Sequence, residues 1–144
     1  MFHKFARFVA LLVVLLPPVM VCAENLVVVI NPNSGVERLS RNDVINIFLG
    51  SFRQLPSGIA ALPVDLPALH PDRAAFYRQL VGKNTAEINT YWARLIFSGR
   101  TRPPIQVEQF EEAVALVQSV VGAITYMERD KVNEKLKIVF ELSQ

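Results

Sequence analysis

The chain is poor in residues that carry thiol, metal and redox chemistry. Its 144 residues include one cysteine and two histidines. Cys22 and His3 both fall within residues 1–23, so the remainder has no thiol and a single histidine, His70. A lone histidine without a partner at ligand spacing matches no zinc motif, and a chain without cysteine forms no disulfide. We therefore expect no metal and no cofactor.

Motifs for catalysis and for nucleotide binding are also missing. No serine stands in a G-x-S-x-G elbow, and none of the six glycines belongs to a glycine-rich phosphate loop. His70, the one histidine beyond residues 1–23, is followed directly by Pro71. The sequence therefore predicts a protein that is not an enzyme.

Neither sign of charge is in excess once the N-terminal segment is set aside. The whole chain has 15 basic and 13 acidic residues, and both Lys4 and Arg7 lie within residues 1–23. The remaining 13 basic and 13 acidic residues give a formal net charge of zero. Binding to nucleic acid relies on a basic surface, so we expect no nucleic-acid partner.

Residues 1–23 have the three parts of a secretory signal peptide. A basic start at Lys4 and Arg7 is followed by an apolar run over residues 8–21, and small or tolerated residues precede Glu24. This order predicts export, with cleavage after Ala23. A retained membrane anchor is the alternative, but the run is shorter than the ~20 residues of a spanning helix. Residues 24–144 are then a single domain by length.

The rest of the chain alternates apolar runs with amphipathic segments. Residues 26–31 are β-branched and apolar almost throughout, which is typical of a central strand buried on both faces. Strands are expected at 26–31, 60–64, 105–107, 123–127 and 135–142, and helices at 40–49, 71–81, 84–98 and 110–121. The alternation predicts the α/β class, as a three-layer α/β/α sandwich with a mixed, mostly parallel sheet.

Patterns within two segments indicate how they pack. In the third helix Ile88, Trp92 and Ile96 belong to an apolar stripe with helical spacing, which predicts that Trp92 is in the core. In the last strand the apolar residues alternate with polar ones, which predicts an edge strand with one wet face. The alternating apolar residues are Leu136, Ile138, Phe140 and Leu142.

Polar side chains follow the first two expected strands. Asn31 and Ser34 come after the first strand, Asp65 after the second, and Arg73 in the next helix. Ligands of α/β proteins gather at the carboxyl ends of the strands. Asn31, Ser34, Asp65 and Arg73 are therefore the candidate residues of a ligand site. For residues 31–34 we favour the alternative that they only shape a turn.

Three arginines surround the expected end of the third helix. They are Arg94, Arg100 and Arg102. Cations are favoured near a helix C-terminus by the helix dipole. A structural role in solvent is therefore expected, ahead of an anion or partner site.

Three glycine-containing motifs resemble those of one protein family. They are LSRNDVINIFLG at 39–50, WARLIFSG at 92–99 and GAITYM at 122–127. In order and spacing they are similar to motifs of the phosphate-type substrate-binding proteins of ABC transporters, over roughly residues 26–139. The resemblance implies one lobe of a type II periplasmic binding protein, located in the periplasm. It also implies a small solute such as phosphate or another oxyanion, and a membrane transporter or sensor protein as partner.

One motif departs from that family. Relatives that hold phosphate have a serine-glycine-threonine turn before an arginine at a helix start, whereas here Arg73 follows His70, Pro71 and Asp72. The proline lacks an N–H donor, and Asp72 places a negative charge where an anion would bind. The phosphate-binding relatives also have two lobes, and the length of this chain suffices for about one.

Two classes of function therefore stay open. The first is binding of a small solute for transport or sensing. The second is an interaction module that keeps the fold without the anion site and pairs with another protein or with itself. For the second class, loops at the expected carboxyl ends of the strands supply the apolar residues of a partner surface. These residues are Val36, Leu66, Leu69 and Met127.

Overall fold

The computed structural model describes residues 25–142, so the expected signal peptide lies outside the described residues. All the expected elements are present, with boundaries shifted by a few residues. The strands are β1 Leu26–Ile30, β2 Leu62–Asp65, β3 Ile105–Gln106, β4 Ala123–Glu128 and β5 Lys137–Glu141. The helices are α1 Arg41–Phe48, α2 Pro71–Val81, α3 Thr85–Ser98 and α4 Phe110–Ser119, with short 3-10 turns at Pro32–Ser34 and Arg129–Lys131. None of the helices in this range has the length and apolarity to cross a membrane.

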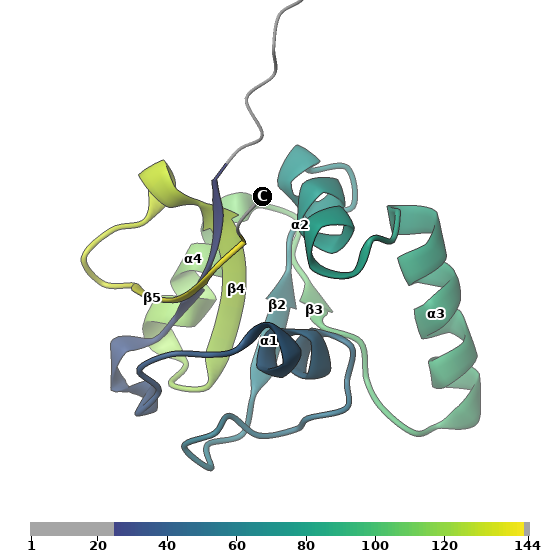
Figure 1. Ribbon diagram of the computed structural model, residues 1–144, viewed down its shortest axis with the longest axis horizontal. Helices are drawn as coiled ribbons and strands as arrows, with labels where there is room; N and C mark the ends of the chain where they lie inside the picture. Colours follow the sequence, from purple (N-terminus) through teal and green to yellow (C-terminus); the bar gives the residue numbers. More distant parts are fainter. Residues whose placement is uncertain (1–24, 143–144) are drawn as a thin grey trace, which may run out of the picture.

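The five strands form one sheet in the order β3-β2-β4-β1-β5. Strand β2 runs parallel to β3 and β4, whereas β1 runs antiparallel to both of its neighbours, β4 and β5. One reversed strand is thus inserted among four that share a direction (Figure 1). This confirms the predicted mixed, mostly parallel sheet. It also confirms β1 as an inner strand and β5 as an edge strand.

Helices cover both faces of the sheet, which confirms the three layers. In Figure 1, α4 lies behind the sheet and α1 lies in front of it. An aromatic cluster joins α1 and α2 to β4: the ring of Phe76 stacks on Tyr126 with centroids 3.8 Å apart, and Phe48 meets both edge-on. Helix α3 packs against α2 and stands beside the β3 edge.

Local sequence signals set the ends of most helices. Ser40 and Asn84 each form a capping box with the acidic residue three positions later, so both satisfy backbone donors that a helix start leaves free. Helices α2 and α3 end at glycines with left-handed backbone, Gly82 and Gly99, as predicted. Helix α4 differs, because it ends at Ser119 and continues into extended backbone, so the expected helix stop at Gly122 is wrong.

A close contact between strands explains why glycine stands at position 122. A Cβ atom at this position would lie 1.9 Å from the carbonyl oxygen of Ala60. The backbone of Gly122 also accepts a hydrogen bond of 2.9 Å from the N–H of Leu62. The absence of a side chain therefore lets the start of β4 approach the start of β2 closely.

Two burial predictions need correction. In β5 the expected alternation fails, because a register shift opposite Val28 and Val29 turns Val139 into the core and leaves Ile138 half-buried. In α3, Trp92 is buried as predicted, but Ile96 is exposed because the last turns of the helix extend beyond the core.

The expected apolar partner surface is also wrong in most of its members. Val36, Leu66 and Met127 are buried in the core, and only Leu69 is exposed, at 96%. The reversal of β1 also separates Val36 from the other three, since it places the loop after β1 at the end of the sheet opposite to the loops after β2 and β4.

Candidate functional site

The sheet topology separates the four residues that the sequence predicts as one ligand site. Because β1 is antiparallel, its last residue Ile30 pairs with Ile124 near the start of β4. Asn31 and Ser34 therefore lie at the amino ends of the parallel strands, whereas Asp65 lies at the carboxyl end of β2, on the opposite side of the sheet's length. The expectation that all four meet at one edge is wrong, and only Asp65 and Arg73 are brought together.

Asn31 and Ser34 have structural contacts where they are. The side-chain amide of Asn31 donates to the carbonyl oxygens of Val117 and Gln118 at the end of α4, at 2.9 and 3.1 Å. Its oxygen accepts from the N–H of Asn33, and the hydroxyl oxygen of Ser34 accepts from the N–H of Val36. These bonds shape the turn and hold α4 to the end of β1.

Asp65 is the centre of a buried polar cluster at the carboxyl end of β2. Its Oδ2 accepts from Arg73 Nε and from the Tyr77 hydroxyl, each at 3.0 Å. Its Oδ1 accepts from the N–H of Leu66 at 3.1 Å and from the hydroxyl of Tyr126. Four donors thus satisfy the carboxylate, as a buried charge requires.

The cluster shifts the ionisation of its members. Burial alone would lower the pKa of Arg73, but the charge of Asp65 and its hydrogen bond raise that pKa above its ordinary value. Burial, and then the charge of Asp65, raise the pKa values of Tyr77 and Tyr126 well above the ordinary value. The arginine stays charged and both phenols stay neutral, so their O–H groups keep donating to the carboxylate.

A small cavity of about 280 Å³ adjoins this cluster. Its wall includes Arg73, Asn89, Trp92 and Gln106. Arg73 Nη2 also donates to Asn89 Oδ1 at 3.3 Å, so Asp65 and Asn89 together hold the guanidinium. An anion there would have to compete with the carboxylate of Asp65 for a cation that is already neutralised. This arrangement favours a structural ion pair.

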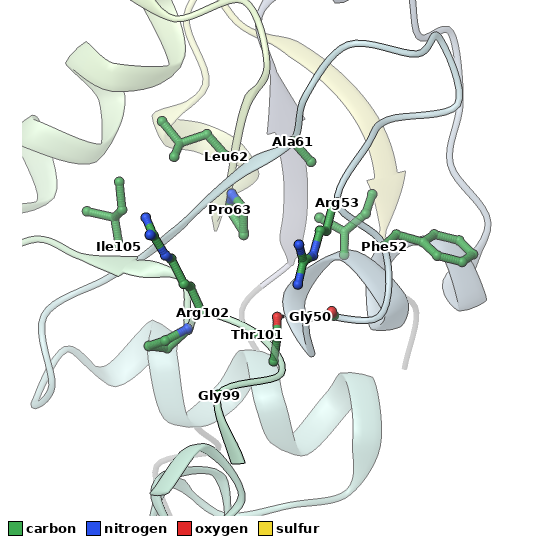
Figure 2. Close-up of a pocket in the computed structure, with 12 residues that line it drawn as sticks. Gly50, Phe52, Arg53, Ala61, Leu62, Pro63, Gly99, Thr101, Arg102 and Ile105 are labelled. Carbon is green, nitrogen blue, oxygen red and sulfur yellow. Dashed lines mark hydrogen bonds between the residues drawn. The ribbon is translucent and has the colours of Figure 1, made fainter. Parts of the chain in front are cut away.

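A larger cavity of about 580 Å³ lies at the amino ends of β2 and β3. Figure 2 shows the side chains of Arg53 and Arg102 at this cavity, together with the turn residues Gly50 and Thr101. Apolar residues of the two strands form other parts of the wall, namely Leu62, Pro63 and Ile105. Cationic and apolar groups thus face the same space.

The turn at Gly50, after α1, contacts the turn that follows Gly99, after α3. These contacts bring Arg53 and Arg102 to the same cavity. A Cβ atom on Gly50 would lie 2.7 Å from Thr101 Oγ1 and 2.9 Å from Trp92 Cη2, and the backbone φ of Gly50 is +83°. Only glycine accommodates both the left-handed backbone and the close contact. The hydroxyl of Thr101 donates to the carbonyl oxygen of Gly50 at 3.2 Å.

Backbone contacts also fix Arg53. Its Nη2 donates to the carbonyl oxygen of Arg100 at 2.8 Å, and its own carbonyl accepts from the N–H of Ala61 at 3.0 Å. The segment after α1 is therefore tied to the segment after α3. Residues that are far apart in the sequence thus form the cavity between them.

The two arginines at this cavity form no ion pair with a carboxylate of the described residues. The lining residues include no aspartate or glutamate. Among residues 25–142, the ion pairs involve neither Arg53 nor Arg102. Guanidinium groups stay charged at all ordinary pH values and bind oxyanions in a forked geometry. The cavity therefore offers two cations to a ligand.

Little in the sequence points to this site. No motif singles out Arg53, and the position of Arg102 indicates only a cation at a helix end. One sequence signal could have indicated the site. Arginine follows the glycine at the end of two helices, as Arg53 after Gly50 and as Arg100 and Arg102 after Gly99. A metal site is not found in the part of the chain described, where no three metal-ligating side chains gather.

Sequence comparisons leave the chain without a match, since neither a family model nor a curated protein matches it. Structural comparison does find similar folds. An ABC-type phosphate transport receptor from Vibrio cholerae superposes with a TM-score of 0.64 at 15% identity, over 81% of this chain and 45% of that one. A protein from Clostridium perfringens, described as a putative phosphate ABC transporter substrate-binding protein and solved with phosphate, gives 0.64 at 16%, over 81% and 44%.

A third similar structure, from Planctomyces limnophilus, is described as a possible phosphate-binding protein and gives a TM-score of 0.58 at 17% identity, over 81% of this chain and 40% of that one. The chain thus spans less than half the length of these proteins. Its fold is that of part of a phosphate-type substrate-binding protein, which confirms the resemblance at the level of fold. All three similar structures are described as binding proteins or transport receptors, and none is described as an enzyme.

Proposed function

We propose that this protein binds a small solute carrying an oxyanion group, for transport or sensing, at the cavity lined by Arg53 and Arg102. The observation that carries the proposal is that two arginines line one cavity and have no carboxylate partner among residues 25–142. The likeness in fold to proteins described as phosphate receptors supports the same class of ligand.

The net charge of the domain sharpens this argument. Residues 24–144 carry equal numbers of basic and acidic side chains, so the protein has no general attraction for anions. Affinity for an oxyanion must therefore come from local groups, such as cationic side chains or backbone N–H donors. The cavity supplies cationic side chains, because Arg53 and Arg102 both line it.

The proposal includes export. The order of basic, apolar and small residues over positions 1–23 supports removal of a signal peptide after Ala23 and a place of action in the periplasm. The partner there would be a membrane transporter or a sensor protein, and the protein would not itself be an enzyme.

A second candidate function is that of an interaction module. The observation that favours it is the exposed apolar end of α3, where Phe97 is 96% exposed and Ile96 is also exposed. Isolated apolar residues on a surface are common, but adjacent large ones mark contact sites more often. Light scattering over a range of concentrations tests self-association, which a strict monomer at all concentrations would contradict.

Titration calorimetry of the purified protein with phosphate and with phenyl phosphate tests the proposed oxyanion binding. Arg53→Gln and Arg102→Gln should each weaken binding by about tenfold to a hundredfold, as expected for the loss of charge-assisted hydrogen bonds. Arg38→Gln is the matched control, because Arg38 is exposed and lies outside the cavity wall. We expect it to bind like the wild type.

Two results would count against the proposal. Equal affinity in the wild type and in both cavity variants would place the ligand elsewhere. An absence of binding by either probe, in a protein that scatters light as an oligomer, would favour the interaction module.

A further inference from the structure

The walls of the arginine cavity carry large apolar groups beside the two cations. Phe52 is 43% exposed and Ile105 is 45% exposed, and both line the cavity. Pro63 and Pro103 extend the apolar wall. In Figure 2, Phe52 and Ile105 lie on opposite sides of the region that holds the arginines. A ligand in this space would therefore meet apolar surface as well as positive charge.

The size of the cavity adds a second constraint. Its volume of about 580 Å³ falls in the range of ~300–1,000 Å³ typical of sites for organic ligands. A bare four-oxygen ion would fill a small part of it and leave Phe52 and Ile105 in water. An organic molecule would fill more of the space and cover both side chains.

From these observations we infer that the ligand is an organic anion, with an oxyanion head held by Arg53 and Arg102 and an apolar body packed against Phe52 and Ile105. The inference rests on the proposed function, since it names the class of ligand for the same cavity. In this arrangement the arginines supply the affinity for the anionic group. Phe52 and Ile105 determine specificity, because burial of apolar surface favours the ligand that has an apolar body.

A comparison of the affinities for inorganic phosphate and for phenyl phosphate tests the inference. Both probes carry the same kind of head, and only phenyl phosphate has an apolar body. Calorimetry of the wild type should give an affinity for phenyl phosphate about tenfold higher or more, from the added apolar burial. Phe52→Ala and Ile105→Ala should each remove much of this preference, because they lower the affinity for phenyl phosphate more than the affinity for inorganic phosphate.

Phe97→Ala is the matched control, since Phe97 is an exposed apolar residue outside the cavity wall. It should keep the full preference for phenyl phosphate. Because Phe52, Ile105 and Phe97 are all exposed, their variants should unfold near the temperature of the wild type. A cavity variant that unfolds much earlier is replaced by Phe52→Leu or Ile105→Val, which should reduce the preference in part.

The outcomes separate the inference from the function on which it rests. Equal affinity for the two probes, lowered by Arg53→Gln, would overturn the organic-anion inference and keep the anion site. A preference for phenyl phosphate that survives both Phe52→Ala and Ile105→Ala would also overturn the inference. No binding of either probe would overturn the inference together with the proposed function.

Discussion

At the scale of single residues, the two kinds of arginine in this protein differ in what surrounds them. Arg73 is buried and held by Asp65 and Asn89, so its charge serves the folded structure. Removing one partner of such a buried pair typically costs about 3–5 kcal/mol of stability. Arg53 and Arg102 are exposed at a cavity and have no carboxylate partner in the described chain. Residue type alone does not distinguish these roles.

The tyrosines around Asp65 lead to a prediction about alkaline pH. Their pKa values are raised in the folded protein, while the unfolded chain loses phenol protons near pH 10. Stability should therefore be fully present below about pH 10 and decline as the pH rises above it, by up to about 1.4 kcal/mol per pH unit for each tyrosine. Urea unfolding between pH 8 and 11 measures this decline.

Tyr126→Phe isolates the contribution of one phenol. The variant should lose some stability at neutral pH, about 1 kcal/mol for a lost hydrogen bond. Its decline above pH 10 should be less steep than that of the wild type, because one buried group no longer titrates. Parallel declines in the two proteins would show that Tyr126 ionises in the folded state as easily as in the unfolded chain.

At the scale of elements, glycines join the segments that the sequence motifs mark. Gly50 lets the turn after α1 contact Trp92 and Thr101, and Gly122 lets the start of β4 approach Ala60. The three motifs that resemble substrate-binding proteins thus coincide with close contacts between elements. Framework packing explains these motifs without reference to a ligand.

Gly122→Ala is the substitution that tests this explanation. Its new Cβ would meet backbone atoms of Ala60, at 1.9 Å from the oxygen, so a strand would have to move. We expect a loss of about 1–3 kcal/mol, the usual effect of overpacking a core. Gly82→Ala is the control. Nothing lies within 4 Å of the Cβ atom that alanine would add there, so the variant would be strained only by the left-handed backbone.

Urea denaturation of the two variants compares these effects. Gly122→Ala should be the less stable of the two. If the order is reversed, the close approach of β4 to β2 is relieved by a small shift and contributes little to the choice of glycine.

At the scale of the whole molecule, the chain corresponds to less than half of the proteins that it resembles in fold. The described residues nevertheless form a sheet covered by helices on both faces, with one continuous core. The candidate ligand cavity lies between the ends of α1 and α3 and the starts of β2 and β3. The proposed binding therefore does not require a cleft between two lobes.

Export is a prediction at this scale. The protein isolated from the periplasm should begin at Glu24, because residues 1–23 have the order of a cleaved signal. Intact mass spectrometry of the fractionated cells measures the new N-terminus. A full-length chain that stays in the membrane fraction would contradict both the cleavage and the proposed place of action.

The sequence by itself determined the class of fold and most helix boundaries. Apolar runs, capping boxes and helix-ending glycines act within a few residues, so their effect can be interpreted locally. Local patterns predict Trp92 in the core and β5 at an edge for the same reason. They also predict Asp65 and Arg73 together, since these two residues flank one short loop.

Only the tertiary structure decided the direction of β1 and the location of the cavity. The direction of a strand depends on the pairing partners that the whole sheet provides, and its local pattern is the same either way. The antiparallel pairing of β1 separates Asn31 and Ser34 from the carboxyl end of β2. Likewise, the two arginines line one cavity because Gly50, Trp92 and Thr101 pack together, a contact between distant segments that no local pattern encodes.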